Sequence, residues 1–130
     1  MGFFDKFKSA RDVAKEEIKE MQWNQLERMD QLDELTELSK STPVVIFKHS
    51  TTCGISRMAL RGFEKNYDYK EGQLKAYFLD LKQYREISNA IAERFNVQHE
   101  SPQLLLIKNG TVTYHTSHSG IDAAALGDKI

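Results

Sequence analysis

Hydrophobic and polar positions repeat with two different periods along the chain, and the change of period marks the predicted elements. Over residues 1–22, apolar side chains recur at helical spacing with charges between them, which predicts one amphipathic helix. From residue 23 onward, short apolar runs typical of strands alternate with helical stretches. The pattern therefore predicts a helical extension over residues 1–22, followed by one domain over residues 23–130.

The expected order of elements from residue 23 is β-α-β-α-β-α-β-β-α. Strands are expected over 23–28, 44–48, 76–81, 103–108 and 111–116. Helices are expected from Asp30 to Ser39, from Cys53 through Phe63, from Ile87 to Phe95, and from near Gly120 to Leu126. Asn109-Gly110 predicts a two-residue hairpin turn between the last two strands. This order predicts an α/β fold in three layers, a central mixed sheet flanked by helices.

Composition and charge narrow the classes of protein. The 130 residues are 40% hydrophobic and 28% charged, as in a globular domain, and the net charge of -1 excludes the basic surface that nucleic-acid binding needs. The longest aliphatic runs have four residues, whereas a membrane span needs about 20, and no signal peptide is predicted. A single cysteine excludes an intrachain disulfide, so we expect a reducing, cytoplasmic location.

That cysteine, Cys53, is predicted to be a reactive thiol. It follows the buried strand 44–48 and begins the next helix, where unpaired N–H groups and the positive end of the helix dipole stabilise a thiolate. We expect the hydroxyl of Ser56 to add a hydrogen bond to the sulfur. A buried cysteine acting as a small apolar side chain is the alternative, but the polar neighbours of Cys53 argue against it.

Two further segments are expected at the same site. Pro102 precedes the hairpin, and a cis bond at Ser101-Pro102 facing Cys53 would leave the backbone of Ser101 free to pair with an extended substrate. Ser117, His118 and Ser119 are expected to open the last helix, whose N-terminus could hold a carboxylate of a small thiol. No metal site is expected, because the histidines and Cys53 do not show the spacing of four convergent zinc ligands.

A cysteine at the first helix after a buried strand, with a proline just before the hairpin, is the thioredoxin-like arrangement. Four short motifs in this sequence point to a more specific family than this general arrangement does. The segments 48–56 (Lys-His-Ser-Thr-Thr-Cys-Gly-Ile-Ser), 97–103 (Val-Gln-His-Glu-Ser-Pro-Gln), Asn109-Gly110 and 115–119 (His-Thr-Ser-His-Ser) resemble those of the monothiol bacilliredoxins, the YtxJ-like proteins. The resemblance covers about residues 23–130.

The resemblance implies a thiol-disulfide oxidoreductase that removes bacillithiol, or a similar low-molecular-weight thiol, from mixed disulfides with client proteins. It makes Cys53 the nucleophile and the small thiol a co-substrate, with no tightly bound cofactor. The other residues expected to bind substrate are Thr51, Thr52, Gly54, Ile55, Ser56, Ser101, Pro102, Ser117, His118 and Ser119.

Gly54 departs from the family, whose motif usually reads Cys-Pro-Ile-Ser. Cys-Gly-Ile-Ser is also similar to the Cys-Gly-Phe-Ser motif of monothiol glutaredoxins, which leaves an iron–sulfur cluster carrier as an alternative function. A non-catalytic adaptor that binds partners through the helix over residues 1–22 is another alternative. The same helix is a candidate for pairing two copies of the chain.

Overall fold

The computed structural model describes residues 21–130. The amphipathic helix predicted for residues 1–22, and the pairing of two copies through it, lie outside the described residues apart from Met21 and Gln22. Within residues 21–130, no helix combines the length and the apolar character that crossing a bilayer requires.

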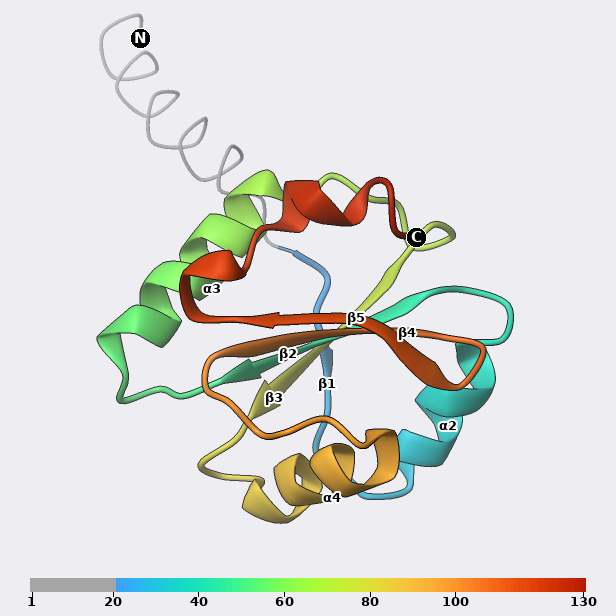
Figure 1. The fold of residues 1–130 in the computed structure, drawn as a ribbon, viewed down its shortest axis with the longest axis horizontal. Coiled ribbons are helices and arrows are strands. Elements are labelled where there is room, and N and C mark those ends of the chain that lie inside the picture. Colours follow the sequence, from blue (N-terminus) through green and yellow to red (C-terminus); the bar gives the residue numbers. More distant parts are fainter. Residues whose placement is uncertain (1–20) are drawn as a thin grey trace, which may run out of the picture.

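Five strands form one mixed sheet in the order β1-β3-β2-β4-β5 (Figure 1). β1 and β2 are parallel to β3, whereas β4 is antiparallel to both β2 and β5. The strands are β1 (Asn24–Gln25), β2 (Val44–His49), β3 (Lys75–Asp80), β4 (Gln103–Lys108) and β5 (Thr111–Ser117). The predicted order of strands along the chain and the mixed sheet are thereby confirmed, although the first strand is two residues long instead of six.

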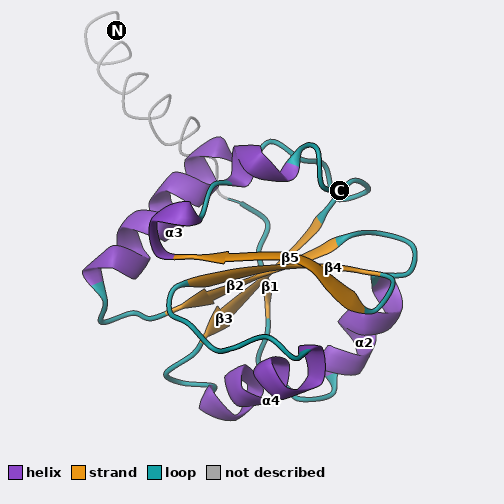
Figure 2. Ribbon diagram, in the orientation of Figure 1, coloured by secondary structure: helices purple, strands orange, loops and turns teal. Residues whose placement is uncertain are grey.

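Helices cover both faces of the sheet and complete three layers (Figure 2). Helices α2 (Gln31–Leu38) and α4 (Arg85–Phe95) lie on one face. On the other face lie α3 (Gly54–Asn66) and two short 3₁₀ turns, η1 (His118–Gly120) and η2 (Ala123–Leu126). This arrangement confirms the predicted three-layer α/β fold.

The central strand β2 shows how the sequence divides the core. All six of its residues are buried, and successive side chains point to opposite faces. Val44 and Ile46 belong to the cluster beneath α2 and α4, whereas Val45 and Phe47 belong to the cluster beneath α3. The next two residues, Lys48 and His49, continue this alternation at the end of the strand.

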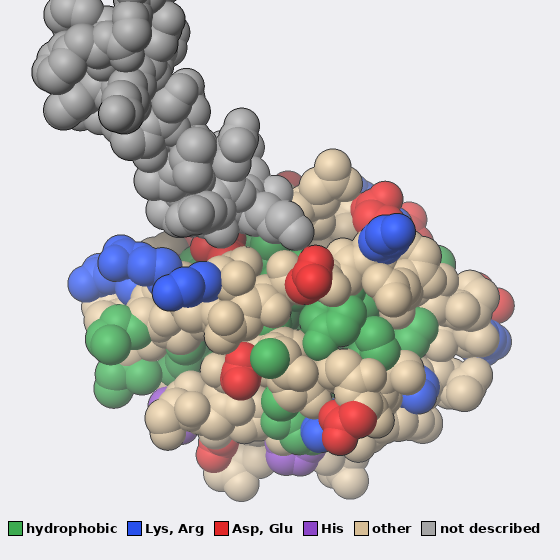
Figure 3. Space-filling view, turned by 90° about the horizontal axis from the view of Figure 1, so that it is seen from above, with side chains coloured by type: hydrophobic (Ala, Val, Ile, Leu, Met, Phe, Trp, Pro, Cys, Tyr) green, Lys and Arg blue, Asp and Glu red, His purple; other side chains and the backbone are tan. Residues whose placement is uncertain are grey.

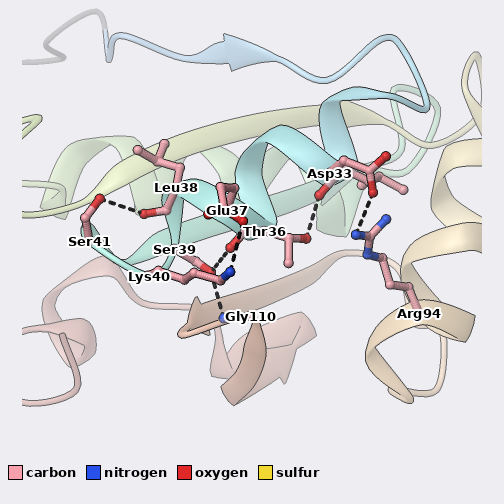
Figure 4. Close-up of polar contacts among 10 residues, drawn as sticks. Asp33, Thr36, Glu37, Leu38, Ser39, Lys40, Ser41, Arg94 and Gly110 are labelled. Atoms are coloured by element: carbon pink, nitrogen blue, oxygen red, sulfur yellow. Dashed lines mark hydrogen bonds and ion pairs between the residues drawn. The ribbon is translucent and has the colours of Figure 1, made fainter.

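Polar contacts tie α2 to the rest of the domain (Figure 4). The amide of Gly110 donates to Ser39 Oγ at 2.8 Å, and the amide of Asn109 donates to the carbonyl oxygen of Ser39 at 2.8 Å. Both hairpin residues have positive φ, 52° for Asn109 and 78° for Gly110, as the predicted two-residue turn requires. Arg94 on α4 pairs with Asp33 on α2 at 2.7 Å.

The prediction of one helix from Gly120 to Leu126 is wrong, because the segment forms the two separate turns η1 and η2. His118 has a left-handed backbone with φ 53°, and Ile121 and Asp122 are extended, which interrupts any continuous helix. The Asp122 side chain instead caps η2 by accepting from the amide of Ala124 at 3.1 Å. A Cβ on Gly120 would collide with Thr116 Oγ1, so a larger residue there would require the Thr116 side chain to move.

Candidate active site

Cys53 occupies the predicted position between β2 and α3. It is the N-cap residue of α3, with an extended backbone (φ −102°, ψ 121°), and its thiol is free and partly exposed. Its carbonyl oxygen accepts the first helical hydrogen bond, from Arg57 N at 3.1 Å, and its amide donates to the Ser50 carbonyl oxygen at 3.2 Å. The backbone of Cys53 is therefore held on both sides while its side chain reaches solvent.

The Cys53 sulfur lies at the N-terminal end of α3. The first amide groups of a helix lack intrahelical acceptors, and together with the helix dipole they place partial positive charge at its N-terminus. The Cys53 side chain makes no capping hydrogen bond, so the sulfur is available to an incoming disulfide. This is the environment in which thiolates are stabilised in thiol-exchange proteins.

Two cationic side chains hold the loop before Cys53. Arg57 Nη1 donates to the Thr51 carbonyl oxygen at 3.4 Å, and Lys82 Nζ donates to Thr52 Oγ1 at 3.0 Å. Neither cation forms an ion pair with a carboxylate of residues 21–130. Arg57 and Lys82 thus place positive charge on the loop that precedes Cys53.

Ser56 does not point its hydroxyl at the sulfur, so that prediction is wrong. Its side chain is fully buried, and Oγ lies 2.7 Å from His49 Nδ1 and accepts from the Ser50 amide at 3.0 Å. Burial is the main cause that lowers the pKa of His49, opposed by the charges of Asp80 and Glu64. His49 and Ser56 therefore form a neutral, buried contact that fixes the turn from β2 into α3.

Strand pairing brings the other predicted segments to the same edge of the sheet. β2 ends, β4 begins and β5 ends there, since Lys48 pairs with Gln103 and Gln103 pairs with Ser117. The Ser101-Pro102 bond is cis, as predicted, and Pro102 is buried. The Pro102 carbonyl oxygen accepts from His118 N at 3.2 Å, which links the two segments directly.

The predicted anion site at residues 117–119 is not formed as expected. His118 begins a three-residue 3₁₀ turn, not an α-helix, so the segment has no helix dipole to hold a carboxylate. Ser117 is half-buried, whereas His118 and Ser119 are exposed. Among residues 21–130, no three His, Cys, Asp or Glu side chains gather in a group that could hold a metal ion.

Lys48, at the end of β2, is a buried charged residue that the sequence analysis missed. Its side chain is fully buried, and Nζ donates to the Ser88 carbonyl oxygen at 3.1 Å and lies 3.3 Å from His99 Nδ1. Burial lowers the pKa of Lys48 to about 8, and burial followed by the charge of Lys48 lowers the pKa of His99. A lysine directly after the apolar run Val44 to Phe47 was the available signal.

The comparisons with known proteins agree with this geometry. The family model for the monothiol bacilliredoxin BrxC matches residues 24–126. The chain belongs to this family. The match confirms the predicted family and assigns the chain to the thioredoxin-like thiol oxidoreductases.

Solved structures show the same fold. The chain is 35% identical to a proposed oxidoreductase with a thioredoxin fold, over 80% of this chain and 89% of that chain, with a TM-score of 0.68. The thioredoxin of Malassezia sympodialis is 22% identical over 82% of this chain and 86% of its own, with a TM-score of 0.63. Fasciola hepatica thioredoxin is 19% identical over 82% of this chain and 95% of its own, with a TM-score of 0.58.

Gly54→Pro, which restores the usual family residue, is expected to raise the free energy of unfolding by about 0.4–1 kcal/mol. Cys53 already has the extended backbone that a residue before proline adopts, and the nearest atom to a Cβ on Gly54 is a guanidinium nitrogen of Arg57 at 3.9 Å. Chemical denaturation measures the change. Gly62→Pro, inside α3, is the matched control and should cost about 3 kcal/mol. A less stable Gly54→Pro protein would contradict this reading of the turn.

Lys48 should make the protein more stable as the pH rises from 8 to 10. The native lysine loses its proton near pH 8 and the unfolded one near 10.5, so the unfolded state binds more protons in this window and stability increases with pH. The pKa of Tyr67, raised by burial to about 12, acts in the opposite direction, but only as the pH approaches 10, where the unfolded tyrosine loses its proton. Urea denaturation at several pH values measures the rise. Lys48→Met should abolish it and Lys70→Met, at an exposed lysine, should not; an unchanged rise in Lys48→Met would show that another group causes it.

Proposed function

We propose that this protein removes bacillithiol, or a similar low-molecular-weight thiol, from mixed disulfides with client proteins. The observation that carries the proposal is the position of Cys53, a partly exposed free thiol at the N-cap of α3 in a member of the monothiol bacilliredoxin family. The sequence contains no second cysteine, so the reaction must proceed with one protein thiol.

The first step is attack by the Cys53 thiolate on the small-thiol sulfur of the mixed disulfide. The bond between that sulfur and the client cysteine breaks as the new bond to Cys53 Sγ forms, and the client thiolate leaves and takes up a proton from water. The partial positive charge at the start of α3 favours the attacking thiolate, and the border formed by Arg57 and Lys82 favours anionic substrates.

The second step returns Cys53 to its thiolate. A second thiol, either free bacillithiol or a partner redoxin, attacks the small-thiol sulfur of the Cys53 adduct and forms a disulfide with it. Overall, the client gains a free thiol and the second thiol is oxidised in its place. The cycle uses the small thiol as a co-substrate and needs no resident cofactor. We place it in the cytoplasm, where reducing conditions keep the single cysteine free.

Transfer of the small thiol can be followed by intact-mass spectrometry. A client protein carrying one bacillithiol mixed disulfide is mixed with an equimolar amount of this protein, without any other thiol. We expect the client to lose the mass of the adduct while this protein gains it at Cys53. Cys53→Ser should show no transfer.

Parallel reactions with glutathione and coenzyme A adducts test the identity of the thiol, and the bacillithiol adduct is expected to react fastest. A client that keeps its adduct in the presence of the wild-type protein would overturn the proposal. Equal loss of the adduct with wild-type and Cys53→Ser proteins would overturn it as well.

A further inference from the structure

A groove runs along the outer side of α3, next to the reactive cysteine. It has a volume of about 520 Å³, and its two walls come from α3 and from the segment at η1. The main lining residues are Ile55, Met58, Ala59 and Gly62 on α3, and His118 and Ile121 on the other wall. We call this feature the α3 groove.

The α3 residues of the groove form a stripe in which Ile55 and Met58 are exposed and Ala59 packs against the core. They recur at i, i+3, i+4 and i+7, so they share one side of the helix, whereas Ser56 and Phe63 are the buried residues of α3. Met58 is 76% exposed and Ile55 is 58% exposed, and Met29 is the only other large apolar side chain so exposed in residues 21–130. An apolar stripe of this kind at a reactive site is typical of a surface that a partner covers.

The stripe lies close enough to Cys53 for an extended peptide at the active site to contact it. Ile55 lies two residues after Cys53, and the stripe extends seven residues along α3, or about 11 Å from Ile55 to Gly62. A strand advances about 3.3 Å per residue, so an extended peptide covers this length with three to four residues. In the in-line attack on the mixed disulfide, the client sulfur lies one disulfide bond beyond the sulfur that Cys53 attacks, so the client chain would place a nearby side chain in the groove.

Three cationic side chains lie on the same helix, α3. Arg57, Arg61 and Lys65 are exposed on α3, and none of them forms an ion pair with a carboxylate of residues 21–130. Glu64, the one acidic residue of α3, accepts a hydrogen bond from Trp23 Nε1 at 2.8 Å. Figure 3 shows Lys and Arg side chains gathered beside hydrophobic ones at the left of the molecule, the side on which α3 lies in Figure 1. The border of the groove therefore attracts negative charge.

We infer that the α3 groove binds the client protein: an extended segment that places an apolar side chain, with an acidic residue beside it, within about three residues of the modified cysteine. This inference rests on the proposed function. The apolar groove takes the client side of the mixed disulfide, and the polar border at Thr51 and Thr52 is left for the charged small thiol.

Two peptides that carry the same bacillithiol mixed disulfide test the inference. They differ only at the second and third positions after the cysteine, Leu-Glu in one and Ser-Lys in the other; bacillithiol disulfide serves as a substrate without a peptide. For the Leu-Glu peptide, Met58→Gln should lower kcat/KM by about tenfold, because the apolar contact is lost. With the Ser-Lys peptide and with bacillithiol disulfide, Met58→Gln should react within about twofold of the wild-type rate, because neither substrate places an apolar side chain against Met58.

Met29→Gln is the matched control, since Met29 is the exposed methionine that lies away from the α3 groove, beside α2. It should leave all three rates unchanged. Arg61→Gln tests the charged border: it should lower kcat/KM for the Leu-Glu peptide by about threefold and leave a Leu-Gln peptide unaffected.

The outcomes separate the two proposals. If the wild-type protein releases the small thiol from no peptide and no client, the proposed function fails. If it acts on both peptides equally, or if Met58→Gln matches wild type on the Leu-Glu peptide, the proposed function stands and the client groove is wrong. A change of oligomeric state in Met58→Gln by analytical ultracentrifugation, with unchanged peptide rates, would assign the groove to a second copy of the chain and likewise overturn the inference.

Discussion

The pairing of β2 with β4 is the constraint on which the site depends. Because the two strands are antiparallel, with Lys48 opposite Gln103, the end of β2 and the start of β4 meet at one edge of the sheet. The turn into Cys53 follows the first strand, and Pro102 precedes the second. β5 then ends at the same edge, opposite Gln103. Every segment proposed to touch substrate is placed by the register of this central pair.

The end of β2 also anchors the site from two sides. Alternation along the strand sends Lys48 toward α4 and His49 toward α3, and each makes a buried polar contact there. His49 and Ser56 fix the first turn of α3, while Lys48 reaches Ser88 and His99 next to the segment that leads to Pro102. The thiol of Cys53 itself is left free of such contacts, so rigidity lies beneath the sulfur while the sulfur stays accessible.

The parts of this architecture that follow local rules were predictable from sequence. The buried run 44–48, the Asn109-Gly110 turn and the start of a helix at Cys53 depend on neighbouring residues, and all three are confirmed. The predicted last helix did not form, because the left-handed backbone of His118 and the extended backbones of Ile121 and Asp122 interrupt it.

The side-chain contacts of the site were less accessible to sequence reasoning. Ser56 was expected at the sulfur from its spacing alone, but its side chain turns into the core, where His49 competes for the same hydroxyl. The contact of Lys48 with Ser88 and His99 joins residues 40 and 51 positions apart. The groove between α3 and η1 likewise exists only once the chain has folded.

Cys53, at the N-terminus of α3, is proposed to be the reactive nucleophile of this protein. The most direct test is the rate of alkylation of Cys53 by iodoacetamide at pH 6, followed by mass spectrometry, against a model thiol and against the same chain unfolded in urea. The native protein should react at least about tenfold faster than both, because only the folded chain has the helix N-terminus beside the sulfur. A native rate no faster than that of the model thiol or the unfolded chain would contradict the account.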